Sequence, residues 1–122
     1  MSFTPIFVVH QHFAKRAGLH YDLRIEIEGV LKSWAMRKEP PITKNVKRLC
    51  IPQPDHDLSY ADFEGEIIQG YGAGIVKIWD KGEYRLEEHV PESKIIVHLD
   101  GVKLRGRYIL INTPKGWLFF KS

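Results

Sequence analysis

The feature that most constrains the fold of this chain is a series of short segments in which apolar and polar residues alternate. In the stretch GLHYDLRIEIEG at residues 18–29, every second residue from Tyr21 to Ile27 is apolar, and the residues between them are polar or charged. This period of two is typical of a β-strand with one apolar and one polar face. Strand-like runs recur along the chain as IFVV, LHYDLRIEI, VLKSWAM, KRLCI, GIVKIWD, EYRLEE, KIIVHL, VKLRGRYILIN and GWLFFKS.

Turn sequences separate several of these runs. Glu28-Gly29 and residues 80–82 (Asp-Lys-Gly) predict hairpins and therefore antiparallel pairing. Nine short strands favour a closed or nearly closed barrel, because closure removes exposed strand edges. We therefore expect a mostly β fold, a small antiparallel β-barrel of about eight strands. One or two short helices are expected within HFAKRAG, ended by Gly18, and LSYADFEG.

Length and composition favour one soluble domain. The 122 residues are 43% hydrophobic, enough for one core, so a single domain is expected over residues 1–122. A formal net charge of +3 tolerates a polyanionic partner without requiring one. Cys50 is the only cysteine and lies in an apolar run, which predicts a buried thiol and no disulfide framework. Since the N-terminus shows neither a leader nor a membrane span, we expect a cytoplasmic protein that does not enter a membrane.

The polar face of residues 18–29 carries an unusual set of side chains. His20 and Asp22 are two residues apart on a strand, roughly 6.5 Å, and can converge on one metal ion. Arg24 follows two residues later, where a guanidinium suits a phosphate better than a cation. The competing interpretation is a solvated polar face with a local pair between Asp22 and Arg24.

A second strand-like run ends in VVHQHF and presents His10 and His12 on one face. Either histidine can complete a ligand set with His20 and Asp22, and the spacing does not choose between them. Two histidines and one carboxylate suit Mn²⁺ or a similar divalent ion, whereas a structural zinc site would more often use cysteine.

Three other segments bear on phosphate chemistry. In PDHDLSYADFEG, His56 and Tyr60 are four residues apart and can contact phosphate or donate a proton, although the same residues can form a simple capped turn. The irregular stretch RKEPPITKNVKR at residues 37–48 is basic and can face either phosphates or solvent. GYGAG at residues 70–74 lacks the features of a P-loop and is interpreted as a bend that enters a strand.

Taken in order, these motifs resemble the phosphoesterase domain of bacterial and archaeal DNA ligase D, the 3′-end-healing module of nonhomologous end joining. The resemblance covers nearly the whole chain and rests on FVVHQH, LHYDLRIE, LKSWAM, KRLCI, DHxLxYAxFEG, GYGAGxVxIWDxG and KLRGRY. It implies a small β-barrel with a Mn²⁺-dependent site that acts on 3′-phosphate and 3′-ribonucleotide ends of DNA or RNA.

The resemblance also implies roles for particular residues. By position, the metal ligands fall on His12, His20 and Asp22. The catalytic and phosphate-binding residues fall on Arg24, His56 and Tyr60, and Lys38 and Arg48 match basic residues that support activity and bind the substrate phosphates.

Departures from the family pattern shape the remaining expectations. The connection between His12 and His20 is two residues longer than is common in the family, a loop change that a metal site can absorb. The family's N-terminal extension is missing here, so the 3′-phosphatase step is expected more strongly than the 3′-ribonuclease step. We expect a stand-alone, monomeric 3′-phosphoesterase whose partners are primer-template DNA ends, with polymerase and ligase functions on separate chains.

Two other functions compete with this one. A noncatalytic β-barrel module that binds nucleic-acid ends would use the same basic surface. A broad small-molecule phosphodiesterase would hydrolyse nitrophenyl phosphodiesters regardless of primer structure.

Overall fold

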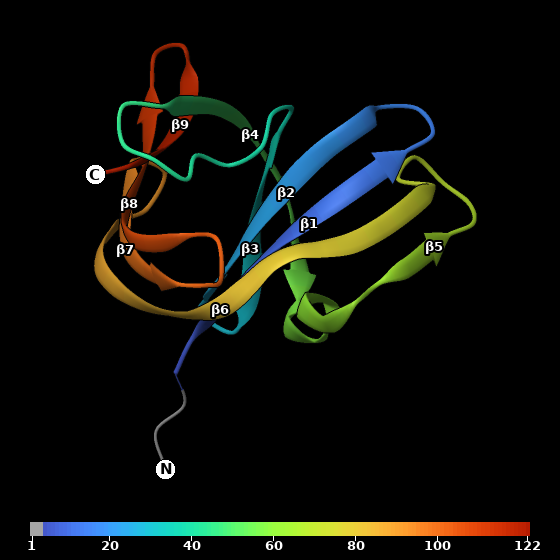
Figure 1. Cartoon of the computed structure of the whole chain (residues 1–122), viewed down its shortest axis with the longest axis horizontal. Coiled ribbons are helices and arrows are strands. Elements are labelled where there is room, and N and C mark those ends of the chain that lie inside the picture. Colours follow the sequence, from blue (N-terminus) through green and yellow to red (C-terminus); the bar gives the residue numbers. More distant parts are fainter. Residues whose placement is uncertain (1–3) are drawn as a thin grey trace.

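The computed structural model describes residues 4–122 and consists almost entirely of β-sheet (Figure 1). Its only helix within those residues is a 3₁₀-helix of five residues, η1, between β4 and β5. The elements are β1 (Ile6–Ala14), β2 (Gly18–Ile27), β3 (Val30–Met36), β4 (Lys47–Asp57), η1 (Leu58–Asp62), β5 (Gly65–Ile67), β6 (Gly74–Val90), β7 (Lys94–Asp100), β8 (Arg105–Thr113) and β9 (Gly116–Lys121).

Eight of the strands close into a ring. Their order is β1-β2-β3-β4-β9-β8-β7-β6, and β6 pairs again with β1, while β5 adds to the edge of β6. All of these strand pairs are antiparallel. Figure 1 shows β6 sweeping from the part of the sheet that holds β7 to the side of β1. The prediction of a mostly β, barrel-like closed sheet is therefore confirmed.

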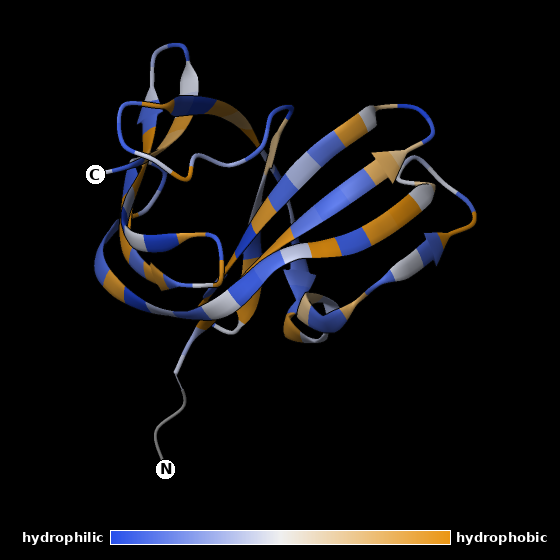
Figure 2. Ribbon diagram, viewed as in Figure 1, coloured by the Kyte–Doolittle hydropathy of each residue, from blue (hydrophilic) through white to orange (hydrophobic). Residues whose placement is uncertain are grey.

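The apolar sides of the strands form the main core. Figure 2 shows the alternation of apolar and polar residues along β1, β2 and β6. Phe7, Leu23, Tyr108 and Phe119 are completely buried, and burial of a large apolar side chain stabilises a fold by roughly 1.5–3 kcal/mol. Cys50 is buried in the same core, as the sequence predicts.

A second, smaller apolar cluster covers the other face of the sheet. Val8 of β1 and Leu31 of β3 pack there against Ala61 of η1, with Tyr60 at the edge. This cluster holds η1 over the outer face of β1 and β3. Polar residues on that face are consequently shielded from water although they lie outside the main core.

The predicted helix in HFAKRAG is wrong. Residues 12–14 belong to β1, residues 15–17 form a turn, and Gly18 begins β2 with φ +77°. Phe13 is paired with Leu19 of β2 on one side and with Ile75 of β6 on the other. Sheet hydrogen bonds on both sides of β1 therefore outweigh the weak local helical preference. The second predicted helix is confirmed, since η1 lies within LSYADFEG.

The predicted hairpin at residues 80–82 is also wrong, because β6 continues through it. Lys81 and Gly82 pair with β1, and the Asp80 carboxylate accepts hydrogen bonds from the backbone N–H groups of residues 102–104 at 2.8–3.2 Å. A Cβ atom at Gly82 would collide with the carbonyl of Asp100, so glycine allows β6 to pass from β1 to β7. The turn at Glu28-Gly29 is a hairpin, with φ of +52° and +83° at the two residues.

No helix in the described part of the chain is long and apolar enough to span a membrane.

Candidate metal and phosphate site

The polar face of β2 lies on the side of the sheet opposite the main core. Antiparallel register places His10 of β1 beside Asp22, and His12 beside His20. On the other side of β2, Ser33 of β3 lies beside Arg24. Directly opposed residues in antiparallel strands share a face. Three strands thus bring the polar side chains of β2 together with those of their neighbours.

His12, His20 and Asp22 form a group with the geometry of a metal site. One ligand atom from each residue lies within 4.8 Å of the other two. Asp22 Oδ2 is 3.6 Å from His12 Nδ1 and 3.3 Å from His20 Nε2. His12 and Asp22 are buried, and His20 is half-buried at the edge of the pocket.

Backbone carbonyls orient the two imidazole rings. His12 Nε2 lies 2.8 Å from the carbonyl oxygen of Gly72, and His20 Nδ1 lies 3.2 Å from that of Gly18. A carbonyl only accepts hydrogen bonds, so in each ring this nitrogen donates its proton. The other nitrogen faces Asp22. When the ring is protonated, this nitrogen donates a hydrogen bond to the carboxylate; when the ring is neutral, its lone pair can bind a cation, which is the arrangement that supports histidine ligands in metal sites. The donor set, two neutral imidazoles and one carboxylate, fits a divalent cation.

The electrostatics of this group favour an ionised carboxylate. Burial alone would raise the pKa of Asp22, but hydrogen bonds from His12 and His20 and the nearby Arg24 hold it well below its usual range. The hydrogen bond with Asp22 raises the pKa of His20, and burial opposes that effect. Asp22 therefore carries the negative charge around which the site is organised.

Arg24 is buried and held from three directions. Its Nε donates to His10 Nδ1 at 2.9 Å, one terminal nitrogen to Ser33 Oγ at 2.9 Å, and the other to Asp22 Oδ2 at 3.3 Å. Its guanidinium carbon also lies 4.9 Å from the centre of the Tyr60 ring. A cation fixed in this way presents a defined donor to an anion in the adjacent pocket.

His10 lies on the same face of β1 as His12 but makes different contacts. The His10 ring is completely buried, accepts from Arg24 and donates through Nε2 to the carbonyl of Phe63 at 3.1 Å. Burial and the Arg24 guanidinium lower the pKa of His10 to about 4. A neutral His10 therefore holds Arg24, and it is His12 that lies with His20 and Asp22.

His56 and Tyr60 line the same pocket as Asp22 and Arg24. Their rings stack with centroids 4.4 Å apart, and Tyr60 stacks on Phe63 at 5.1 Å. Burial and, secondarily, Arg24 lower the pKa of His56, whereas burial raises the pKa of Tyr60. These residues enclose a pocket of about 180 Å³, lined by His12, Ala14, Ala17, His20, Asp22, Arg24, Gln53, Pro54, His56, Tyr60, Ile67, Tyr71 and Gly72.

Lys38 and Arg48 do not line this pocket. They line a neighbouring pocket of about 280 Å³ with Ala35, Arg37, Lys47, Leu49 and Ile51. Ala35 lies beside Asp22 in the register of β2 and β3, so the second pocket continues along the same face of the sheet. Arg48 also donates from Nε to the carbonyl of Glu39 at 2.7 Å. The basic residues thus lie next to the pocket that holds His12, His20, Asp22 and Arg24, and they do not line it.

Three residues of the site were missed by sequence reasoning. Ser33 could have been found, because the Glu28-Gly29 hairpin sets a register that places it opposite Arg24. The carbonyls of Gly72 and Phe63 gave no signal, since any residue type has a carbonyl. The motifs around them did not show that these carbonyls would reach the histidines of β1.

Comparisons with known proteins give a consistent family. The model of the family described as "DNA Ligase D 3'-phosphoesterase domain" matches residues 10–112. The chain is 47% identical over 112 residues to the "Multifunctional non-homologous end joining protein LigD" of Pseudomonas aeruginosa, covering 88% of this chain and 13% of that protein. It is 47% identical over 111 residues to the "Multifunctional non-homologous end joining DNA repair protein LigD" of Mycobacterium tuberculosis, with coverage of 88% and 14%. The corresponding protein of Mycolicibacterium smegmatis is 46% identical over 124 residues, with coverage of 92% and 16%. The chain thus spans only a small part of the length of these relatives.

Proposed function

This chain belongs to the DNA ligase D 3′-phosphoesterase domain family, and we propose that it hydrolyses phosphate esters at the 3′ ends of DNA or RNA during nonhomologous end joining. The observation that carries the proposal is the convergence of His12, His20 and Asp22 with the anchored Arg24 in one pocket. A metal-type ligand set beside a fixed guanidinium is suited to a phosphoryl group.

We propose Mn²⁺, or a similar divalent cation, as the cofactor of this site. His12, His20 and Asp22 would hold it, because they offer two imidazole lone pairs and one carboxylate within reach of one another. When bound, the cation would supply positive charge for a phosphate oxygen and would lower the pKa of water.

Arg24 has the clearest role among the residues of the chain itself. Its three hydrogen bonds fix the guanidinium before substrate arrives, so stabilising the charge that develops on the phosphoryl oxygens requires little reorganisation. The lowered pKa of His56 favours a neutral ring, which would donate a hydrogen bond from its N–H to a phosphate oxygen. Tyr60 would orient His56 by stacking and carries a hydroxyl that stays protonated.

The proposed reaction at a 3′-phosphate end is a hydrolysis. The oxygen of water forms a bond to phosphorus, the bond from phosphorus to O3′ breaks, and O3′ takes a proton, which leaves a 3′-hydroxyl and inorganic phosphate. At a 3′-ribonucleotide end, water attacks the last diester, one of its two P–O ester bonds breaks, and that oxygen takes the proton.

The neighbouring basic pocket would hold the strand that leads to the 3′ end. Lys38, Arg48 and the adjacent Arg37 and Lys47 would contact backbone phosphates, which gives affinity that depends on salt and carries no sequence preference. Primer-template ends are therefore the proposed nucleic-acid partner, with polymerase and ligase activities supplied by other domains or chains.

Phosphate release from a 3′-phosphate primer tests the proposal. The wild-type protein with Mn²⁺ should release inorganic phosphate and leave an end that a polymerase extends, and Asp22→Asn should not. Intact DNA binding without release would instead support a noncatalytic end-binding module. Equal rates on a nitrophenyl phosphodiester and on the primer, with no effect of primer structure, would support a small-molecule phosphodiesterase.

A further inference from the structure

Tyr71 is an exposed aromatic residue at the rim of the metal and phosphate pocket. Its side chain is 74% exposed, yet it lines the same pocket as His12, Asp22 and Arg24. A single exposed ring is ordinary on a protein surface, so it is the position of Tyr71 at this pocket that points to a role. Neither the proposed hydrolysis nor the fold uses Tyr71.

The turn that carries Tyr71 is hydrogen-bonded to one of the proposed metal ligands, His12. The carbonyl of Gly72, the next residue, accepts the hydrogen bond from His12 Nε2, and the backbone N–H of Ala73 donates to the carbonyl of Gly70 at 3.1 Å. The carbonyl of Ala73 in turn accepts from the backbone N–H of Lys15 at 2.9 Å. Figure 1 shows this loop, between β5 and β6, beside the ends of β1 and β2. The backbone that carries Tyr71 is thus held in place beside the pocket.

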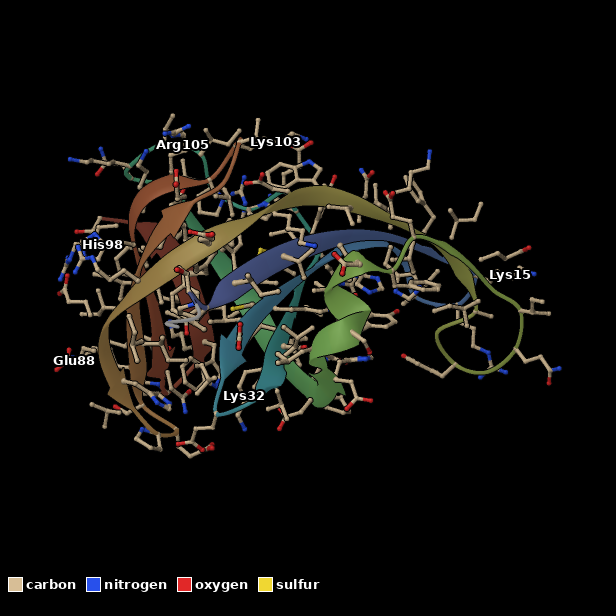
Figure 3. All side chains as sticks on the ribbon, turned by 90° about the horizontal axis from the view of Figure 1, so that it is seen from below. Lys15, Lys32, Glu88, His98, Lys103 and Arg105 are labelled. Atoms are coloured by element: carbon tan, nitrogen blue, oxygen red, sulfur yellow. The ribbon has the colours of Figure 1, made fainter. Side chains whose placement is uncertain are left out.

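The two sides of the pocket differ in charge. On the side of β3 and β4 lie the cations of the basic pocket, Arg37, Lys38, Lys47 and Arg48. On the side of the Tyr71 turn, the lining residues are uncharged: Ala14, Ala17, Ile67, Tyr71 and Gly72. Lys15 and Arg16 belong to the nearby β1–β2 turn and do not line the pocket; Figure 3 shows Lys15 at this end, away from Glu88 and His98.

A nucleic-acid 3′ end has the same asymmetry of charge. The strand that leads to the last phosphodiester carries one phosphate per nucleotide, whereas the terminal nucleoside beyond it carries none. The cations therefore suit the strand, and the uncharged aromatic rim suits the terminal nucleoside, whichever P–O ester bond is broken.

We propose that Tyr71 is a stacking platform for the base of the 3′-terminal nucleoside and so determines specificity for ribonucleotide ends over 3′-phosphate ends. The inference rests on the proposed function and adds to it a subsite on the far side of the scissile phosphate. Stacking of a base on an aromatic side chain contributes about 1–3 kcal/mol, which corresponds to roughly 5- to 150-fold in kcat/KM. Because every base has an aromatic face, the platform would have little base preference.

Two primers of the same sequence test the platform, one ending in a 3′-ribonucleotide and the other in a 3′-phosphate. Tyr71→Ala should lower kcat/KM for ribonucleotide removal by roughly 5- to 150-fold while changing phosphate removal less than about twofold. Tyr71→Phe keeps the ring and should resemble wild type. Phe13→Ala is a matched control, since it removes another exposed ring from the opposite face of β1 and should leave the ratio of the two activities unchanged.

A third primer, ending in an abasic ribose, separates stacking from other effects. The wild-type protein should lose about the same factor on this primer that Tyr71→Ala loses on the normal one, and the variant should lose nothing further. Equal losses of Tyr71→Ala on the phosphate and ribonucleotide ends, or additive effects of the variant and the abasic end, would overturn the platform alone. A wild-type protein that removes 3′-phosphate but no 3′-ribonucleotide would also overturn the platform and leave the proposed function standing. Inactivity of the wild type on all three primers would refute the proposed function itself, and the platform with it.

Discussion

Replacement of Arg24 by lysine is the most direct probe of the buried network behind the site. Lysine preserves the charge but has one nitrogen on a flexible stem, whereas three nitrogens of Arg24 reach His10, Ser33 and Asp22 separately. No single ammonium position can make all three contacts. His10 Nδ1 would then lose its donor in a completely buried place.

The magnitudes follow from these contacts. A buried acceptor left without its hydrogen bond costs about 1–3 kcal/mol, so Arg24→Lys should lower the free energy of unfolding by that amount. Loss of one preorganised donor to a developing oxyanion typically lowers the rate by about 10²- to 10³-fold. Urea unfolding measures the first effect, and phosphate release from a 3′-phosphate primer measures the second.

Two further variants make the result interpretable. Arg105→Lys is the matched control, because Arg105 forms an exposed pair with Asp100 at 3.5 Å and should change neither quantity. Ser33→Ala keeps Arg24 and removes one of its acceptors, so it should fold and show a smaller loss of activity. If Arg24→Lys unfolds within about 0.5 kcal/mol of wild type and turns over at a similar rate, the guanidinium network is not what positions the phosphate.

The remaining predictions concern the metal, the basic pocket and the core thiol. Asp22→Asn should abolish binding of Mn²⁺, measured by calorimetry, as well as activity, since the site loses its only anionic ligand; unchanged Mn²⁺ affinity would contradict the assignment. A chelator should abolish activity in the wild type, and added Mn²⁺ should restore it. Arg37→Ala and Lys47→Ala should weaken primer binding and make it less dependent on salt concentration. Neither variant should change the hydrolysis of a nitrophenyl phosphodiester. Loss of that small-substrate reaction would place these residues in the site itself. Burial raises the pKa of the Cys50 thiol to about 12, so iodoacetamide should label the folded protein slowly from pH 7 to pH 10 and the urea-unfolded protein quickly. The same shift implies that the stabilising contribution of the neutral thiol is present below its unfolded pKa of 9.0 and is lost as pH rises toward 12; fast labelling of the folded protein at pH 8 would contradict this burial.

Much of the fold followed from local patterns. The alternation in residues 18–27 and the Glu28-Gly29 turn predicted a β-hairpin, and they also placed His20, Asp22 and Arg24 on one polar face. These predictions succeeded because period and turn chemistry are properties of adjacent residues. The predictions for residues 12–18 and 80–82 failed because pairing with β6, β1 and the segment after β7 decided their structure.

The choice between His10 and His12 shows where local information ends. Both histidines lie on the same face of the same strand, so the spacing by itself determined the chemical types of the site and left their assignment open, and only the family resemblance implied His12. The tertiary structure separates them mainly through two carbonyls more than fifty positions away. The carbonyl of Phe63, together with Arg24 of the neighbouring strand, takes His10 into the buried network, while the carbonyl of Gly72 orients His12 toward Asp22. Only the folded chain brings those carbonyls to β1, because the chain must first pass through η1 and β5 and turn back toward β1. No periodicity in the sequence encodes that path.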